Sequence, residues 1–149
     1  MAFRRRAPKP TTSPELIPLS LSDSQWRGTQ LEGARRLVER YCGDAAMPPT
    51  LASLDVAIDG WFNDDDERIE VNALVNAVGV ALGHHLAAAL GLAWVIAADE
   101  DGSDLVLHQA GSDVLVSPCK LVAQRIVAGD RTFVAATFDG LVAELGNSD

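Results

Sequence analysis

The chain has 149 residues, of which 48% are hydrophobic and 22% charged, and this length and composition are typical of one globular domain. Its formal net charge of −9 argues against nucleic-acid binding, because phosphate backbones attract clustered lysine and arginine. Four of the 12 basic groups lie in residues 1–9, which leaves 8 basic and all 21 acidic groups, a net charge of −13, in residues 10–149.

Proline and basic residues characterise the first 18 positions. Pro8, Pro10, Pro14 and Pro18 all fall there, with threonine and serine between them. Such a composition favours an extended segment over a packed element. We therefore predict a disordered basic arm over residues 1–18 and a single folded domain over residues 19–146.

A first helix is predicted from Ser22 to Gly43. Ser22 and Gln25 have the spacing of a capping box, and Leu21 and Trp26 have the spacing of a hydrophobic staple. Apolar residues then recur at helical intervals until the glycine.

Two more helices are predicted before any strand. The second begins near Thr50, and the acidic residues 63–66 end it and cap a third helix over residues 66–90. The third is apolar nearly all round, so we expect it at the centre of the fold. Gly79 and Gly83, one turn apart, predict a close approach by the sheet or by a second subunit.

Three short runs of β-branched and apolar residues follow, over residues 92–98, 105–108 and 114–116. Short turns separate them, which predicts a three-stranded antiparallel meander. Ser117 and Pro118 then have the pattern of a helix start. A final helix ends the chain, although residues 132–134 also fit a strand. The predicted class is α+β, with three N-terminal helices, the meander and two C-terminal helices.

Several motifs for metal or nucleophilic chemistry are incomplete. Asp99, Asp101 and Gly102 suggest a calcium loop, but the residue that falls at the twelfth position is His108 rather than glutamate. Ser117 and Lys120 have the Ser-x-x-Lys spacing of penicillin-binding enzymes without the other elements of that site. We therefore expect a turn and a helix cap at these places.

The histidines and glycine-rich patterns also give no metal or cofactor site. His84 and His85 are adjacent, so on a helix they point about 100° apart. No dinucleotide-binding or phosphate-binding glycine motif occurs in the sequence. We predict neither a metal nor a cofactor.

Cys119 is the candidate nucleophile. A helix N-terminus and Lys120 would both favour its thiolate and lower its pKa. Catalysis would also require a histidine such as His108, and the spacing places none beside it. We favour a small, partly buried thiol and keep Cys119 with His108 as the enzyme alternative.

Asn72 and Asn76 lie one turn apart in the apolar third helix. Buried amides need hydrogen-bond partners, so these two either tie a loop to the helix or line a small polar pocket with Trp61 or Trp94.

Acidic residues gather between positions 59 and 70. They are Asp59, Asp64, Asp65, Asp66, Glu67 and Glu70. Such runs are usually solvated helix caps, and the alternative is a face for a basic partner.

No export or membrane segment is predicted. Proline-rich residues 7–14 stand where a signal peptide would have its apolar region, and four polar residues interrupt the apolar stretch 71–96. Cys42 and Cys119 fit two reduced thiols, so we predict a cytoplasmic protein.

An ordered series of short motifs resembles a family of small bacterial proteins, the domain of unknown function 3806. The motifs are VNALVNAVGVALG at 71–83, LGLAWVI at 90–96, DEDGSDL at 99–105 and the segment 117–126. The resemblance covers about residues 20–145. It implies an autonomous bacterial domain with no catalytic residues to carry over.

These observations together favour a non-enzymatic protein that binds a protein partner or itself. The alternative is a small enzyme that uses Cys119 with a histidine, or a ligand-binding protein with a polar pocket at Asn72 and Asn76.

Overall fold

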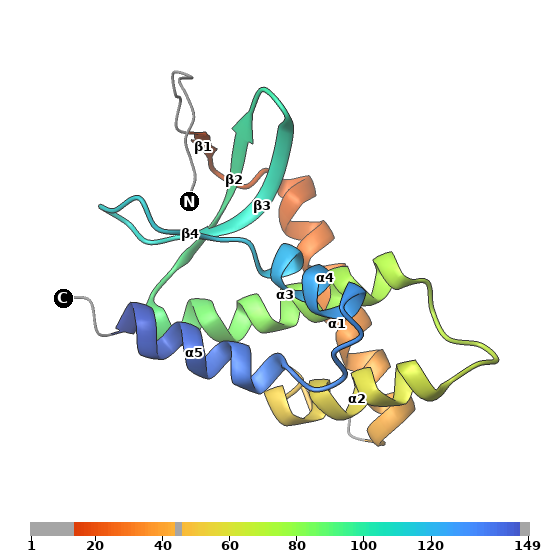
Figure 1. Cartoon of the computed structure of the whole chain (residues 1–149). Helices are drawn as coiled ribbons and strands as arrows, with labels where there is room; N and C mark the ends of the chain where they lie inside the picture. The colour runs from red at the N-terminus through yellow and green to blue at the C-terminus, as the bar shows by residue number, and fades with distance from the viewer. Residues whose placement is uncertain (1–13, 44–45, 147–149) are drawn as a thin grey trace.

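The computed structural model describes residues 14–43 and 46–146. It is an α+β fold of five helices and a four-stranded antiparallel sheet with the order β1-β2-β3-β4 (Figure 1). The elements in chain order are β1 (Glu15–Ile17), α1 (Leu21–Cys42), α2 (Leu51–Asn63), α3 (Val71–Leu90), β2 (Ala93–Asp99), β3 (Gly102–His108), β4 (Leu115–Val116), α4 (Pro118–Val127) and α5 (Val134–Gly146). The sheet occupies the upper part of Figure 1, helices α2, α3 and α5 the lower part, and α1 runs from one to the other.

Helix α3 is the centre of the core, as its composition predicts. Helices α1, α4 and α5 all pack against it, and its middle residues, among them Val78, Leu82 and Leu86, are fully or almost fully buried. Burial of this apolar surface supplies the main driving force for folding. By length and composition alone α3 could cross a membrane, but the core helix of a soluble protein passes the same test. Half of its most apolar 18-residue stretch is buried inside this fold.

The two glycines of α3 are sites of close approach. A β-carbon on Gly79 would lie 2.7 Å from the Cα atom of Cys119 at the start of α4. A β-carbon on Gly83 would meet the ring of Trp94 on β2 and lie 3.0 Å from Pro118. The prediction of a close approach by the sheet is therefore confirmed at Gly83, whereas Gly79 approaches a helix.

The expected three-stranded meander is wrong by one strand. Residues 15–17, predicted as part of the arm, form β1 and pair with β2 through Ile17 and Ile96. Pro14 and Pro18 flank this edge strand, where proline is tolerated because one side of the strand needs no ladder hydrogen bonds. Residues 1–13 of the predicted arm lie outside the described residues.

The predicted start of α1 is also wrong. Ser20, rather than Ser22, is the N-cap, and its side chain accepts the backbone N–H of Asp23 while the Asp23 carboxylate accepts that of Ser20. Ser20 and Ser22 are each followed three residues later by a side chain that can complete a capping box, Asp23 and Gln25. The acidic Asp23 makes the earlier cap the stronger one. Leu21 and Trp26 are accordingly exposed and form no staple.

The third helix begins five residues later than expected. It starts at Val71 with Glu70 as an N-cap whose side chain makes no capping hydrogen bond, so the acidic residues 63–66 do not cap it. The two C-terminal helices are confirmed, and residues 132–134, which also fit a strand, do not form one: residues 132 and 133 precede α5, and Val134 is its first residue.

Candidate functional site

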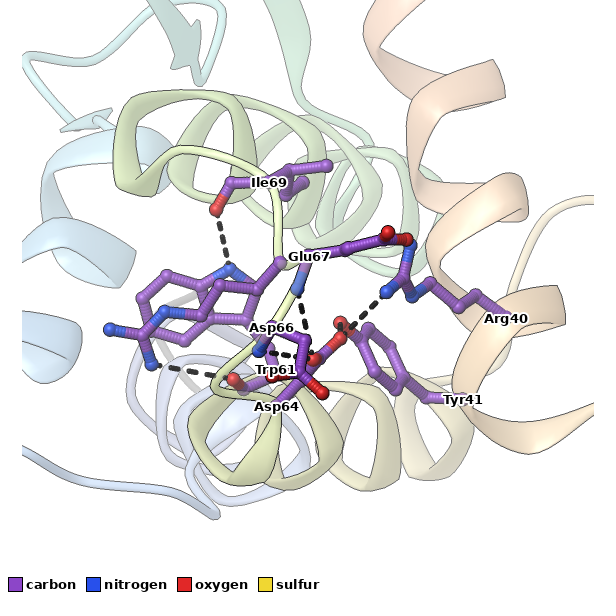
Figure 2. Close-up of polar contacts among 8 residues, drawn as sticks. Arg40, Tyr41, Trp61, Asp64, Asp66, Glu67 and Ile69 are labelled. Atoms are coloured by element: carbon purple, nitrogen blue, oxygen red, sulfur yellow. Dashed lines mark hydrogen bonds and ion pairs between the residues drawn. The ribbon is translucent and has the colours of Figure 1, made fainter.

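A cluster of polar contacts surrounds the carboxylate of Asp64 at the end of α2 (Figure 2). One carboxylate oxygen accepts hydrogen bonds from the Tyr41 hydroxyl and from Arg40 Nη2, each at 2.7 Å. The other accepts the backbone N–H groups of Asp66 and Glu67 at 3.1 and 3.3 Å. These bonds lower the pKa of Asp64 to about 2, with the Tyr41 hydroxyl as the largest cause.

Two features of α1 and α2 position this cluster. Gly60 leaves room for the Tyr41 ring, because a β-carbon there would lie 2.8 Å from it. Arg40 lies 5.2 Å from the centre of the Tyr41 ring and is held by its bond to Asp64. The carboxylate thus ties the C-terminal end of α1 to the loop between α2 and α3, and it fixes Arg40 beside that loop.

Trp61 anchors the other side of the same loop. Its indole Nε1 donates to the carbonyl oxygen of Ile69 at 2.8 Å (Figure 2). The guanidinium of Arg68 lies over its ring, 4.1 Å from the ring centre. Trp61 is 5% exposed, so this predicted site residue belongs to the core and its polar atom is satisfied within the loop.

A groove of about 370 Å³ lies between α1 and α3 next to the Asp64 cluster. Gly33, Leu37, Ala73 and Ala77 give it an apolar lining. Its charged lining consists of arginines, Arg36 and Arg40, and no acidic residue lines it.

A second hollow, of about 550 Å³, lies on the outer face of the sheet. Ala97 and Val106 belong to its lining, and so do three acidic side chains and one basic one: Asp99, Asp101, Asp104 and Lys120. Asp104 accepts a hydrogen bond from the Ser117 hydroxyl at 2.8 Å and lies 3.6 Å from Lys120 Nζ. Ser117 therefore uses its hydroxyl on Asp104 rather than as a helix cap.

The edge of the sheet beside this hollow is only partly paired. Strand β3 pairs with β2 over its whole length but with β4 only at Leu107 and His108. Within the described part of the chain, residues 102–106 have no strand partner on this side. The start of α4 contacts this edge through Ser117 and Asp104, and Val106 is buried, whereas residues 102 and 103 are exposed. An unpaired edge presents backbone N–H and C=O groups to another extended chain.

Cys119 does not have the environment of an activated nucleophile. Burial raises its pKa to about 11, and the negative charge of Asp104 adds to the shift. The expected lowering by the helix N-terminus and Lys120 is therefore wrong, because desolvation of the thiolate is larger. Where α4 packs against α3, the neighbour of Cys119 is Gly79.

The histidines have other partners. His108 contacts the carbonyl oxygen of Ser112 at 3.0 Å, and His85 contacts that of Pro49 at 2.7 Å. His84 is half-buried, and burial together with the charge of His85 lowers its pKa. Among residues 14–43 and 46–146, no three His, Cys, Asp or Glu side chains come together as a possible metal site.

The asparagines of the predicted polar pocket lie outside the groove and the sheet hollow. Asn72 is exposed near the start of α3, Asn76 is half-buried, and neither lines the groove or the sheet hollow. Trp94 packs on Gly83 at the other end of α3, with Arg27 lying 5.7 Å from the centre of its ring.

The acidic run at positions 59–70 is divided between internal contacts and solvent. Asp64 forms the cluster described above, and Asp59 forms an ion pair with Arg131 at 2.8 Å. The remaining acids, Asp65, Asp66, Glu67 and Glu70, are exposed.

Sequence reasoning missed both the Asp64 cluster and the groove. Arg40 and Tyr41 lie 24 and 23 residues from Asp64, and no local pattern relates them. The sequence does contain one signal, the spacing of Gly33, Leu37 and Arg40 along one face of α1. A search for apolar stripes does not detect this pattern.

The fold and these surfaces define a small α+β domain with a partly paired sheet edge. A family model described as "Domain of unknown function (DUF3806)" matches residues 52–138, and the chain belongs to this family, as the resemblance predicts. The match includes Asp64, α3 and the strands β2–β4, whereas Arg40, Tyr41 and β1 lie before it.

A crystal structure of a protein from Bacteroides thetaiotaomicron VPI-5482 has a similar fold, with a TM-score of 0.65 and 20% sequence identity. The alignment covers 92% of this chain and 51% of that protein, so the chain spans about half the length of its structural neighbour. No curated protein matches the sequence.

Proposed function

We propose that this chain is a protein-binding module whose partner presents an extended basic segment to the outer edge of the sheet. The observation that carries the proposal is the position of the unpaired edge of β3, residues 102–106, beside the acidic hollow of about 550 Å³. An extended peptide that adds a strand gains main-chain hydrogen bonds, and its alternate side chains then reach one face of the sheet.

The charges of the hollow favour lysine and arginine on the partner. Lys120 is paired with Asp104, which leaves Asp99 and Asp101 exposed at the turn between β2 and β3. The net charge of −9 adds a long-range attraction for a basic partner, which raises the rate of association more than the affinity.

The same charges disfavour the pairing of β3 with a second copy of itself. Two acidic edges brought together would place Asp101 and Asp104 of each copy near those of the other, and like charges across a strand pair are destabilising. We therefore propose a different protein as partner rather than self-association. We place this activity in the bacterial cytoplasm, where two reduced cysteines are expected.

The enzyme alternative has less support. A thiol with a pKa near 11 contains little thiolate at neutral pH, and the thiolate is the nucleophile. A ligand pocket at Asn72 and Asn76 also lacks support, because the exposed Asn72 is already solvated.

The proposal is tested with a fluorescent peptide of alternating lysine and valine, its binding followed by anisotropy. We expect binding that weakens at least tenfold between low and high salt, since salt screens exposed charges. A peptide with glutamate in place of lysine should not bind. A peptide with proline at alternate positions should bind weakly, because proline cannot donate a main-chain hydrogen bond.

The matched variants are two double substitutions that remove the same charge. Asp99→Asn with Asp101→Asn should weaken binding, and Asp65→Asn with Asp66→Asn should not. Equal effects of the two pairs, or equal binding of the glutamate peptide, would contradict the proposal. Repeating the titrations with a 149-residue chain in which Arg4, Arg5 and Arg6 are changed to alanine separates weak binding from competition by the chain's own basic residues.

A further inference from the structure

We infer that the groove between α1 and α3 is a binding site for a small amphiphile with one anionic head group and an apolar body. This site is on a different surface from the sheet edge and does not depend on the proposed function. Its volume of about 370 Å³ lies within the usual range of small-ligand pockets, about 300–1,000 Å³.

The floor of the groove is suited to an alkyl or aryl body. Helices α1 and α3 come close at Gly33 and Ala77, where a β-carbon on the glycine would lie 3.7 Å from Ala77 Cβ. The groove continues past Ala73 to Ile69, which is 39% exposed, and these small or apolar residues leave room and an apolar surface. Filling this space removes apolar area from water on both partners.

The head group is selected by the two arginines. The side chain of Arg36 is 74% exposed, and its ion pair with Glu32 is long, at 3.7 Å. Glu32 is itself bound more closely by Arg35, at 2.6 Å. The guanidinium of Arg36 is therefore weakly paired, and guanidinium groups bind carboxylates and phosphates through two parallel hydrogen bonds.

Arg40 is held in place for the same task. Arg40 Nη2 donates one hydrogen bond to Asp64 (Figure 2), and its guanidinium lies 5.2 Å from the centre of the Tyr41 ring and is also attracted by Glu67. These contacts hold Arg40 at the lining of the groove. Holding Arg40 in advance lowers the conformational entropy that binding would otherwise cost. In a chain with a net charge of −9, a groove with arginines as its charged lining favours an anion.

The test compares three probes of equal chain length, octanoate, 1-octanol and octylammonium, by calorimetry and by amide chemical shifts of the full chain. Octanoate should bind at least tenfold more tightly than octylammonium, with 1-octanol between them. The largest shifts should fall on the amides of residues 33, 73 and 77. Equal binding of octanoate and octylammonium, or shifts elsewhere, would overturn the inference, as would no octanoate binding at all.

The matched variants place the same bulk on one helix, inside and outside the groove. Ala73 and Ala88 are both exposed on α3, so Ala73→Leu and Ala88→Leu should both fold. Ala73→Leu should raise the dissociation constant for octanoate at least tenfold and Ala88→Leu should leave it unchanged. Arg36→Gln should raise the dissociation constant of octanoate to nearly that of 1-octanol. Equal losses in the two leucine variants would contradict a site in this groove.

Discussion

Asp55, in the middle of α2, accepts the backbone N–H of Val134 at 2.7 Å although the two residues are 79 positions apart. The same carboxylate also accepts the N–H groups of Phe133 and Ala135, at 2.8 and 3.0 Å. The first turn of α5 is therefore capped by a side chain from another helix. A negative charge at this end also complements the helix dipole.

Replacement of Asp55 by alanine should destabilise the fold because three backbone N–H groups lose their acceptor. We expect the free energy of unfolding to fall by about 1–3 kcal/mol, the range for lost caps and charged hydrogen bonds. Urea denaturation measures this change. Asp139→Ala, which removes an exposed acid of α5, is the control and should change stability by less than about 0.5 kcal/mol.

Gly79→Ala should also destabilise, although alanine is the better helix former. The new β-carbon would lie 2.6 Å from Cys119 Sγ and 2.7 Å from its Cα, so α4 would have to move. Overpacking of this kind costs about 1–3 kcal/mol, against a gain of about 1 kcal/mol in helix propensity. Thermal unfolding gives the net effect.

Gly140→Ala is the matched control for Gly79→Ala. It makes the same change in α5, where no atom outside the local helix lies within 4 Å of the new β-carbon. This variant should be stabilised by up to about 1 kcal/mol. If both glycine variants were stabilised alike, the close contact of α3 with α4 would be wrong.

Asp64 should make stability depend on pH in the acid range. Its folded pKa is about 2 and its ordinary value is 3.8, so its contribution is fully present well above pH 3.8 and is lost as pH falls towards 2. The excess in free energy of unfolding of the wild type over Asp64→Asn should therefore disappear as the pH is lowered from 5 to 2. Urea titrations at several pH values measure this difference, with Asp65→Asn as a variant of equal charge. A difference in free energy of unfolding between wild type and Asp64→Asn that did not change with pH would contradict the Tyr41 and Arg40 contacts.

Cys119 should react slowly with iodoacetamide. A pKa of about 11, against an ordinary value of 9.0, leaves about one hundredth of the usual thiolate at pH 8, and burial restricts access further. In a Cys42→Ser background, alkylation of the folded chain should be about 100-fold slower than that of the urea-unfolded chain. Equal rates would contradict the burial of this thiol, and faster alkylation of the folded chain would favour the enzyme alternative with Cys119 and His108.

Helical elements could be predicted because their signals are local. The apolar period of α1 and the glycine at its end are both visible in the sequence. In the structure Gly43 has the left-handed φ of 73° that ends such helices. Strand β1 could not be predicted in this way. Three residues between two prolines give no period, and their pairing with β2 depends on a segment about 80 residues away.

The candidate sites depend on contacts across the fold. The acids 63–66 have the composition of a helix cap, and only the packing of α1 against α2 turns Asp64 towards Tyr41. In the same way, Cys119 has the sequence position of an activated thiol, and its burial against Gly79 reverses the expected pKa shift. Long-range packing overrides the local signal in both cases.

The most direct test of the proposed function is amide hydrogen exchange of the full chain with and without the lysine–valine peptide. The account predicts slower exchange at some of residues 102–106, because an added strand would form main-chain hydrogen bonds with the unpaired edge of β3. It predicts no change in the loop at residues 65–70. Protection of that acidic loop with unchanged exchange in β3 would contradict the account and would transfer the basic-partner surface to the loop between α2 and α3.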